Sequence, residues 1–321
     1  MSTSSGTISA RREVFNFLRP QVCSSPLVRI GGKSDGAYLL PRDFDGITDC
    51  FSPGVENRKN FEDELLQKHN IRSHLMDFSS EPNLLQTPLV EGKQFFRSKW
   101  LGTVSSDDTM SLDDWVSADA LDSNSDLVLQ MDIEGAEYEV LKAASDDTLE
   151  RFRIISIEFH RLAKKMNVDQ QLEGQLLPVA RKLEKLFVCV HAHANNCCRM
   201  IEVDGVAPRV PNVIELTLLR KDRFEASGPM RVGRGKLPHA SDIRKNIVSL
   251  PFVELDQGWS SAPSNRRATI RKVRNLVLDA LDPRVPMKLS VVPLLDRIYH
   301  RVPPKLLKSL GRIGGKERSK Q

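Results

Sequence analysis

The sequence has 321 residues, 40% of them hydrophobic, and a formal net charge of +5. This length allows one large domain or two small ones with a buried core. No run of about 18 apolar residues occurs, which argues against a transmembrane helix. The N-terminal MSTSSGTISARREV has no apolar core like that of a secretory signal. The five cysteines form no disulfide pattern, so we expect a cytoplasmic protein.

The charge is divided unevenly along the chain. From Arg223 to the C-terminus, 21 Lys and Arg accompany 8 Asp and Glu, whereas the residues up to Asp222 contain 26 and 34. An acidic body followed by a basic extension indicates two parts. We therefore predict a partly disordered N-terminal segment (1–25), a main domain (26–224) and a basic C-terminal extension with one or two helices (225–321).

Short apolar segments alternate with segments of helical periodicity. After a polar start to about Ala10, the sequence predicts, in chain order, a helix at 11–18, a strand at 47–55, a helix at 60–69, a strand at 71–79, a helix at 109–116, a strand at 126–133, a helix at 136–145, a strand at 153–160, a helix at 171–186, and strands at 187–196 and 211–221. This alternation predicts an α/β fold with a mainly parallel sheet covered on both faces. The last two strands lack a helix between them, so they could pair antiparallel.

Ligands of such folds bind beyond the carboxyl ends of the strands. The residues that leave the predicted strands are therefore the informative ones: Asp77, Asp132, Glu158, His160, His191 and His193. For His191 we favour a hydrogen-bonded core histidine. Asn195 and Asn196 fit a turn as well as they fit a site.

Carboxylates gather in the stretch LQMDIEGAEYEVL, residues 129–141. Asp132 and Glu134 alternate at the strand exit and would point the same way if the strand continued. Gly135 allows a sharp turn into the next helix. For Glu137 and Glu139 we favour a structural role at the helix start, where a carboxylate is stabilised. For Asp132 we favour a functional role, because a buried strand seldom ends in an acid without a partner.

A cofactor loop is predicted after the first strand of the sheet. Ser52-Pro53-Gly54-Val55 forms a turn in which Gly54 lets the backbone approach a ligand. Asp77 ends the next strand, where nucleotide sites often place the acid that binds ribose. The loop has no GxGxxG pattern, so a cofactor without phosphates, such as S-adenosylmethionine, fits better than a dinucleotide.

Several segments together resemble the FkbM-type methyltransferase family. They are VRIGGKSDGAYLLP (28–41), CFSPGVENRKNFEDEL (50–65), Asp77-Phe78, MSLDDW (110–115), LVLQMDIEGAEYEVL (127–141), ISIEFH (155–160), VHAHANN (190–196) and PNVIELTLLRK (211–221). The resemblance covers 28–221 and implies a Rossmann-like class I methyltransferase fold with a seven-stranded sheet. It also implies S-adenosylmethionine as methyl donor and a hydroxyl of a sugar, glycan or natural product as acceptor.

The resemblance also implies a set of cofactor-binding positions. These are Ser52, Pro53, Gly54, Val55 and Glu56 in the first loop, then Glu62, Asp77, Phe78, Asp107 (with Asp108 as its alternative) and Asp132. Two departures stand out. Ala37 occupies a position where a second glycine is usual, and the first loop lacks the GxGxG run common among methyltransferases.

For the chemistry, we hypothesise that His160 or His193 is the general base and that Asp132 orients it or the substrate, with Glu158 beside them. Metal-assisted deprotonation is the alternative, since Asp132, Glu134, Glu158, His160 and His193 offer suitable ligand atoms. Spacing alone does not show that they converge, so we assign no metal. Adjacent Cys197 and Cys198 do not have zinc-ligand spacing.

Other functions remain open. A nucleotide-sugar-using transferase also needs acidic strand ends, and a catalytically inactive methyltransferase fold could serve as a binding module. The basic extension could be a solvated appendage, or it could contact anionic lipid through residues 266–274 and 305–312. Nucleic-acid binding is not expected, because aromatic residues are nearly absent from the basic stretches.

Overall fold

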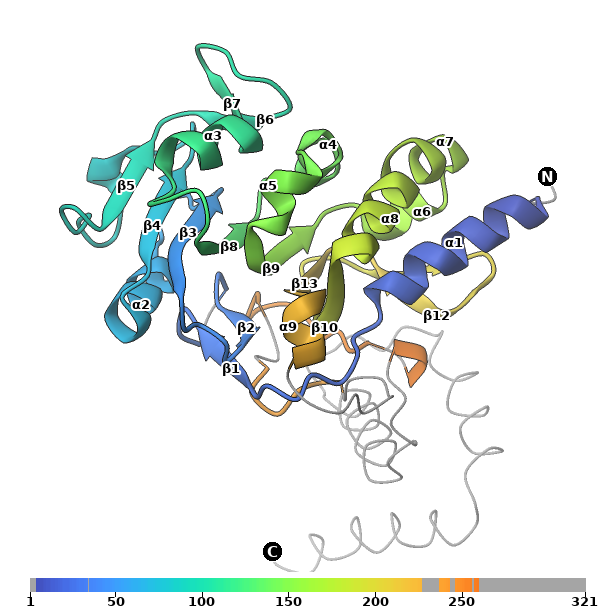
Figure 1. The fold of residues 1–321 in the computed structure, drawn as a ribbon. Coiled ribbons are helices and arrows are strands. Elements are labelled where there is room, and N and C mark those ends of the chain that lie inside the picture. Colours follow the sequence, from blue (N-terminus) through green and yellow to red (C-terminus); the bar gives the residue numbers. More distant parts are fainter. Residues whose placement is uncertain (1–3, 34, 227–236, 243–245, 256, 260–321) are drawn as a thin grey trace, which may run out of the picture. The chain divides into compact units, whose positions relative to one another are not determined.

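The computed structural model describes residues 4–33, 35–226, 237–242, 246–255 and 257–259 (Figure 1). Residues 1–262 form one compact unit, and a second unit, 263–321, lies outside the described residues. The basic segments 266–274 and 305–312 lie there too, so their contact with anionic lipid stays a prediction. No helix of the described residues is long and apolar enough to span a membrane.

A seven-stranded sheet forms the centre of the compact unit. In spatial order its strands are β10 (Phe187–Ala194), β13 (Ile214–Arg220), β9 (Phe152–Phe159), β8 (Asp126–Met131), β3 (Ile47–Pro53), β4 (Arg72–Met76) and β5 (Gln94–Arg97). The strands from β9 to β5 are parallel, and β13 runs antiparallel to both of its neighbours. The predicted mainly parallel seven-stranded sheet is confirmed, as is the antiparallel pairing of the last two strands.

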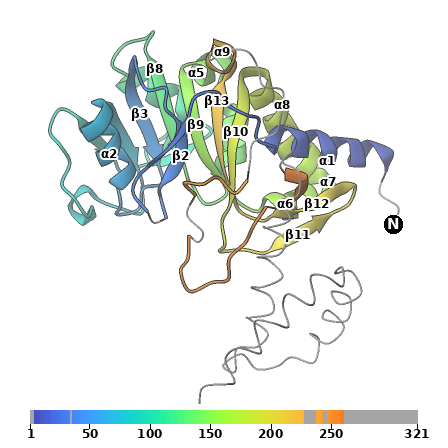
Figure 2. The same cartoon turned by 90° about the horizontal axis from the view of Figure 1, so that it is seen from below.

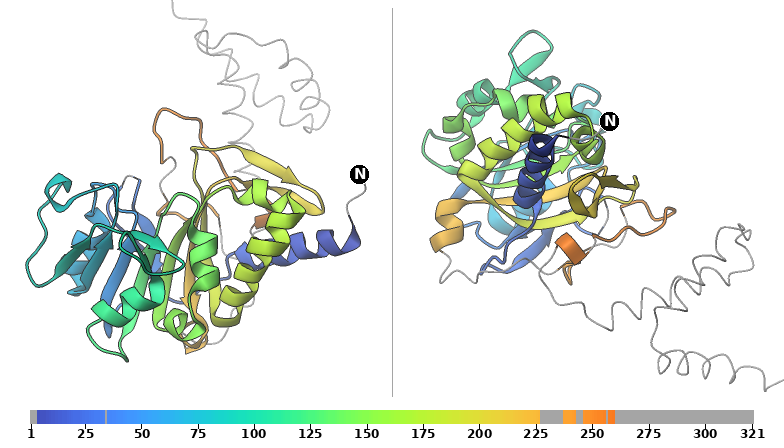
Figure 3. Two further views of the ribbon diagram at one scale, coloured as in Figure 1. Left: turned by 90° about the horizontal axis from the view of Figure 1, so that it is seen from above. Right: turned by 90° about the vertical axis from the view of Figure 1, so that its right-hand side faces the viewer.

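Both faces of the sheet are covered (Figures 2 and 3). One face packs against α2 (Asn60–His69), α9 (Lys221–Ala226) and the hairpin of β1 (Leu27–Ile30) and β2 (Tyr38–Pro41). The other packs against α1 (Ser5–Leu18), α3 (Leu112–Asp119), α4 (Glu137–Ala143), α5 (Asp146–Glu150) and α8 (Leu177–Leu186). The layers therefore bury the strands on both sides, as their continuous apolar character predicts.

Successive residues of each central strand enter different cores. Leu127 and Leu129 of β8 join the core under α1, α3, α4, α5 and α8, whereas Val128 joins the core under α2 and the hairpin. All three side chains are fully buried. The same alternation determines the face of the sheet to which each residue at the carboxyl end of a strand points.

The remaining elements are short. They are η1 (Pro82–Leu84), β6 (Trp100–Gly102), β7 (Thr109–Ser111), α6 (Leu162–Met166), α7 (Asp169–Gln171), η2 (Leu172–Leu176), β11 (Met200–Val203), β12 (Val206–Pro211) and η3 (Gln257–Trp259). α7, η2 and α8 follow one another without a break and include the helix predicted at 171–186, with a π-helical turn at η2.

The N-terminal helix begins earlier than the sequence pattern predicts. α1 starts at Ser5 rather than at Arg11, because Ser4 caps it by accepting the Thr7 N–H at 3.2 Å. Arg11 is buried and donates from Nε to the carbonyl of Met166 at 2.9 Å. The polar start of the chain therefore belongs to the packed unit.

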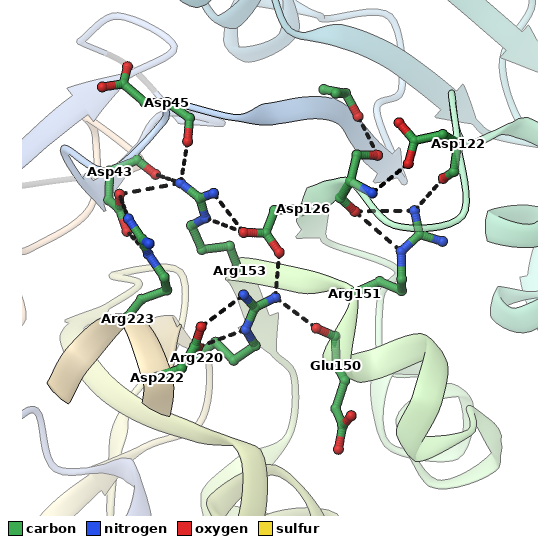
Figure 4. A network of polar contacts seen from close by, with 12 residues as sticks. Asp43, Asp45, Asp122, Asp126, Glu150, Arg151, Arg153, Arg220, Asp222 and Arg223 are labelled. Carbon is green, nitrogen blue, oxygen red and sulfur yellow. Dashed lines mark hydrogen bonds and ion pairs between the residues drawn. The ribbon is translucent and has the colours of Figure 1, made fainter. Parts of the chain in front are cut away.

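An ion-pair network holds the edge of the sheet where β8 and β9 begin (Figure 4). Asp126 accepts from Nε of Arg153 at 2.7 Å and from Nη1 of Arg220 at 2.6 Å. Asp43 accepts from both Arg223 and Arg153. Asp43 and Asp126 are therefore both neutralised by arginines. We assign the edge of the sheet where β8 and β9 begin a structural role.

Candidate active site at the carboxyl edge of the sheet

The chain leaves β3 and β8 in opposite directions, so their carboxyl ends form the switch point of the sheet. Gly54 follows β3 with φ +81°, and its N–H donates to the carbonyl of Met76 at 2.9 Å. A Cβ at Gly54 would lie 1.6 Å from the carbonyl oxygen of Asp132. The loops after β3, β4 and β8 therefore meet at Gly54. Only a residue without a side chain fits at this position.

Asp77 connects the loop after β4 to the loop after β3. Its Oδ2 accepts the N–H of Glu56 at 2.8 Å, and its Oδ1 accepts the N–H and hydroxyl of Ser79 at 2.8 and 2.7 Å. The side chain is buried, and Glu56 adopts a left-handed backbone with φ +48°. Asp77 thus fixes both predicted cofactor loops, and each oxygen keeps further lone-pair capacity.

An exposed aromatic pair lies next to Asp77. Phe78 stacks on Trp100 with ring centroids 5.3 Å apart, and the two side chains are 45% and 49% exposed. Asp107 and Asp108 are exposed between β6 and β7, where the carbonyl of Asp108 accepts the Trp100 N–H at 2.9 Å. Phe78 and Asp108, both predicted as cofactor-binding positions, are therefore linked through Trp100, which was not predicted.

Glu62 lies behind the first loop instead of at the surface. It is buried, and its Oε1 hydrogen-bonds the hydroxyl of Ser52, which also donates to Oε1 of Gln130 at 2.6 Å. Gln130 in turn donates to the hydroxyl of Tyr38 at 3.2 Å. Burial raises the pKa of Glu62 to about 7. Glu62 and Ser52 thus support the ends of β3 and β8 from within.

A row of titratable side chains crosses four neighbouring strands. His193 of β10 pairs with Glu215 of β13, and Glu215 pairs with Glu158 of β9. Met131 of β8 pairs with Ile157 of β9, which places Asp132 beside Glu158. Directly opposed residues share a face of a sheet. We call these four residues, His193, Glu215, Glu158 and Asp132, the polar row.

His160 lies where the polar row meets the turn after β8. Its Nδ1 is 2.9 Å from Oε1 of the fully buried Glu137. Its Nε2 is 3.4 Å from Oε1 of Glu158, 3.8 Å from Oδ1 of Asp132 and 3.4 Å from Oε2 of Glu134. The imidazole therefore connects a buried carboxylate on one side with three carboxylates on the other.

The turn after β8 differs from the expected one. Glu134 and Gly135 both adopt left-handed backbone, with φ +57° and +112°, and the Glu134 side chain is 85% exposed. Glu137 does more than start a helix: its Oε1 accepts the N–H groups of Ile133 at 3.3 Å and Gly135 at 2.9 Å, besides contacting His160. Glu137 therefore has the structural role that we expected and also contacts a residue of the candidate site, His160.

Electrostatics set the polar row apart from the rest of the protein. Burial, strengthened by Glu158, raises the pKa of Asp132 to about 8. Burial and the neighbouring Glu215 raise the pKa of Glu158 to about 8, and burial raises that of Glu215 to about 8. In the described part of the chain, neither Asp132 nor Glu158 forms an ion pair with Lys or Arg. The row therefore retains protons that exposed carboxylates would release.

The two histidines respond in opposite directions. Burial disfavours the charged imidazole of His160, but the hydrogen bond and charge of Glu137, with Glu158 and Asp132, outweigh it and raise the pKa to about 9. Burial lowers the pKa of His193, whose Nε2 is 3.1 Å from Oδ1 of Asn246.

Residues from the C-terminal side complete one end of the polar row. Asn246 donates to the carboxylates of Glu215 and Asp35, the latter at 2.8 Å. Asn196 accepts the N–H of Ile247 at 2.9 Å, and Asn195 donates to both oxygens of Glu158 at 3.3 and 3.2 Å. The Asn-Asn pair therefore serves both the site and the anchoring of this segment.

The predicted site residues fall into two groups. His160, Glu158, Asp132 and His193 converge on the polar row, whereas Ser52, Glu56 and Asp77 lie at the cofactor loops. His191 is a buried histidine hydrogen-bonded to Asp242 at 3.0 Å, as predicted. Glu215, Tyr38 and Asn246 were not predicted from the sequence. A single acid within the apolar strand PNVIELTLLRK was an available signal for Glu215, but Asn246 belongs to no recognisable pattern.

One subset of the site has metal-ligand geometry. Single ligand atoms of Asp132, Glu158 and His160 all lie within 4.8 Å of one another. Among the described residues no such group includes a cysteine.

Part of the compact unit matches a known protein family. Residues 47–184 match the family model described as the methyltransferase FkbM domain. No curated protein matches the chain. A similar solved structure is the crystal structure of an O-methyltransferase from neocarzinostatin biosynthesis in complex with S-adenosyl-L-homocysteine. It is 8% identical, with a TM-score of 0.28, over 55% of this chain and 50% of that chain. The chain thus spans about half the length of that structure. The part of the chain from β3 to α8, which contains the cofactor loops and the ends of β8 and β9, is therefore similar to the methyltransferase FkbM domain.

Proposed function

We propose that the protein transfers a methyl group from S-adenosylmethionine to a hydroxyl oxygen of a polar acceptor, such as a sugar, glycan or natural product. The observation that carries the proposal is the contact of Gly54 with Asp132 at the switch point of the sheet. It brings the cofactor loops beside the polar row, and the family match assigns this region to a methyltransferase domain.

The residues of the cofactor loops fit S-adenosylmethionine. Asp77 offers a carboxylate for a ribose diol, and the exposed ring of Phe78 offers an apolar surface for a purine. The loop of Ser52 to Glu56 contains no lysine or arginine that would favour a phosphate. S-adenosylmethionine would supply a methyl group already activated on a sulfonium.

The polar row fits a hydroxyl acceptor. The carboxylates of the row and the imidazole of His193 can accept hydrogen bonds from hydroxyl groups and take up the proton that methylation releases. Asp132 lies both at the row and at the contact with Gly54, so it is the residue best placed to orient an acceptor toward the methyl group. His193, whose pKa is lowered by burial, stays a candidate base, and His160 can accept a proton only above its raised pKa of about 9.

Binding of the cofactor product is the first test. Calorimetric titration of the full chain with S-adenosylhomocysteine should show one site. Asp77→Asn should weaken binding by about 10-fold or more, because charged hydrogen bonds contribute roughly 1.5–3 kcal/mol. Asp222→Asn is the matched control, because Asp222 pairs with Arg220 at the opposite edge of the sheet (Figure 4), and this variant should bind normally. No binding at millimolar product would overturn the proposal in favour of a binding module. Selective binding of a nucleotide sugar would favour a sugar transferase.

The acceptor is then identified from the methyl group that a deletion strain no longer adds. Mass spectrometry of glycans and secreted metabolites from a deletion strain should reveal a molecule that lacks one O-methyl group. Purified protein should restore that group with labelled S-adenosylmethionine, and Asp132→Asn should not. His160→Ala and His193→Ala separate the candidate bases. Full activity of both variants would exclude a histidine base, and transfer to nitrogen or carbon would refute the acceptor class.

A further inference from the structure

We infer that Asp132, Glu158 and His160 form a binding site for one divalent first-row transition metal ion, of the manganese type, that holds the acceptor. The inference rests on the proposed function, because it names an additional cofactor of the same site. It begins from the three side chains at the ends of β8 and β9, whose ligand atoms all lie within 4.8 Å of one another.

The separations suit a single ion. Nε2 of His160 is 3.4 Å from Oε1 of Glu158 and 3.8 Å from Oδ1 of Asp132. Ligands about 2.1 Å from an octahedral ion lie about 3 Å apart when adjacent and about 4.2 Å apart when opposite. The observed distances fall between these values, so shifts of a few tenths of an ångström would complete the coordination.

The orientation of His160 is that of a metal ligand. Glu137 is fully buried and its Oε1 lies 2.9 Å from Nδ1 of His160, so Nδ1–H can donate to this carboxylate while Nε2, which faces Asp132 and Glu158, would bind the ion in place of its proton. Metal-binding histidines almost always donate their second ring nitrogen to a carboxylate or carbonyl in this way. Asn195 orients Glu158 similarly, by donating to both of its oxygens.

A buried carboxylate oxygen without a hydrogen-bond donor is an independent indication of a ligand between these three side chains. Oδ1 of Asp132, the oxygen that faces His160, is shielded from solvent and accepts no hydrogen bond. The Glu158 side chain is only 7% exposed, and Asn195 is its one hydrogen-bond donor among the described residues. Buried carboxylate oxygens are costly without a partner. At the opposite edge of the sheet, Arg153 and Arg220 satisfy the carboxylate of Asp126, whereas no arginine or lysine among the described residues pairs with Asp132 or Glu158.

The types of ligand atom determine which class of metal ion the site would bind. Two carboxylates with one imidazole suit manganese, iron, cobalt or zinc, whereas magnesium prefers oxygen ligands alone. Three protein ligands leave coordination positions open. The Asp132 side chain is 30% exposed, so those positions can be reached from solvent. An acceptor hydroxyl bound there would lose its proton more readily and would be held beside the contact with Gly54.

The test uses the full chain, treated with EDTA and dialysed, and Mn²⁺ alone as probe. Electron paramagnetic resonance of free Mn²⁺ should show saturation at one ion per chain. Glu158→Gln and His160→Gln should each weaken binding by about 10-fold or more, and so should Glu137→Gln, since outer partners of metal ligands contribute similarly. Glu139→Gln, which removes an exposed carboxylate from the same helix, is the matched control and should bind Mn²⁺ normally.

A measurement on the unaltered protein guards against misfolded variants. Pulsed electron paramagnetic resonance of bound Mn²⁺ should detect coupling to a histidine nitrogen. Absence of saturable binding, binding without nitrogen coupling, or binding unchanged in folded Glu158→Gln would each overturn the inference. Titration with S-adenosylhomocysteine in EDTA separates the two proposals. Cofactor binding without Mn²⁺ binding would refute only the metal site, and Mn²⁺ binding without cofactor binding would refute the proposed function.

Discussion

At the scale of single residues, Gly54 is the position most sensitive to a change in size. Gly54→Ala would force an alanine to φ +81° and drive its Cβ to 1.6 Å from a backbone carbonyl. We expect a loss of stability well beyond the roughly 1–2 kcal/mol of left-handed strain alone, together with loss of S-adenosylhomocysteine binding. Gly92→Ala isolates the strain, because Gly92 has φ +69° and open space around it. Urea unfolding of both variants measures the difference, and equal midpoints would contradict this view.

Glu137 carries a second prediction at this scale. Glu137→Gln removes the charge that holds Ile133, Gly135 and His160 in place. Charged hydrogen bonds in a buried site contribute roughly 1.5–3 kcal/mol, so we expect destabilisation of about that size. Glu139→Gln, exposed on the same helix, should stay within about 0.5 kcal/mol of the original protein. Chemical denaturation checks both; a neutral Glu137→Gln would show that the turn does not depend on the carboxylate.

The residues also show how far the sequence could predict the site. Asp132 was recognisable because an acid directly follows a buried strand. The full role of Glu137 was not, because a carboxylate in a first helical turn looks the same whether it is solvated or buried. Its burial depends on His160, which arrives from the next strand. Glu215 required knowledge of the pairing between β13 and β9, which no local pattern contains.

At the scale of elements, a buried aspartate joins β3 to β4. Asp49 is fully buried and accepts from Nε of Arg72 and from the ring of His74, both at 2.8 Å. Burial alone would raise the pKa of Asp49, but hydrogen bonds from His74, Thr48, Leu121 and Arg72 outweigh it and hold the pKa below 3.8. The two strands are therefore joined most firmly when this carboxylate is ionised.

This shift predicts how stability depends on pH. Because the folded-state pKa is the lower one, the contribution of Asp49 is complete above about pH 3.8 and is lost as pH falls through the folded-state value. Asp49→Asn should cost about 3 kcal/mol at neutral pH, since it leaves the Arg72 guanidinium, which is only 19% exposed, with a neutral partner. The variant should also lose less stability between pH 4 and pH 2, which thermal unfolding across that range measures. An unchanged acid dependence would contradict the assignment.

The long helices and strands could be predicted from the sequence, whereas the short hairpins could not. The long strands and helices of the sheet layers were predicted because burial imposes periodicity on them. The β1–β2 hairpin was not, since its segment VRIGGKSDGAYLLP has short strands and three glycines. β11 and β12 were missed for the same reason, because edge hairpins of four to six residues contain too few alternations to detect.

At the scale of the whole molecule, segments outside the family match belong to the same core. Trp259 is fully buried, stacks edge-on against Phe15 of α1 with centroids 4.8 Å apart, and donates to the carbonyl of Arg209 at 3.1 Å. Neither Phe15 nor Trp259 lies within residues 47–184. The boundaries predicted at residues 25 and 224 thus stay predictions, while packing extends beyond both.

Trp259→Ala tests this packing. Removing a buried aromatic side chain should cost about 3–5 kcal/mol. Trp100→Ala, at a position 49% exposed, should cost far less. Differential scanning calorimetry of the two variants measures the contrast. Equal unfolding temperatures would show that the segment around Trp259 contributes nothing to the core.

The place of β13 has a consequence for synthesis on the ribosome. β13 lies between β9 and β10 although it is made after both, so β9 has an open edge until Arg220 has emerged. All eight residues of β9 are buried in the finished protein, and an open apolar edge readily pairs with other chains. A nascent chain halted before Ile214 would therefore lack Glu215 and present FRIISIEF to its neighbours. The polar row and the cover of the β9 edge are therefore completed by the same seven residues of β13, at the same moment of synthesis.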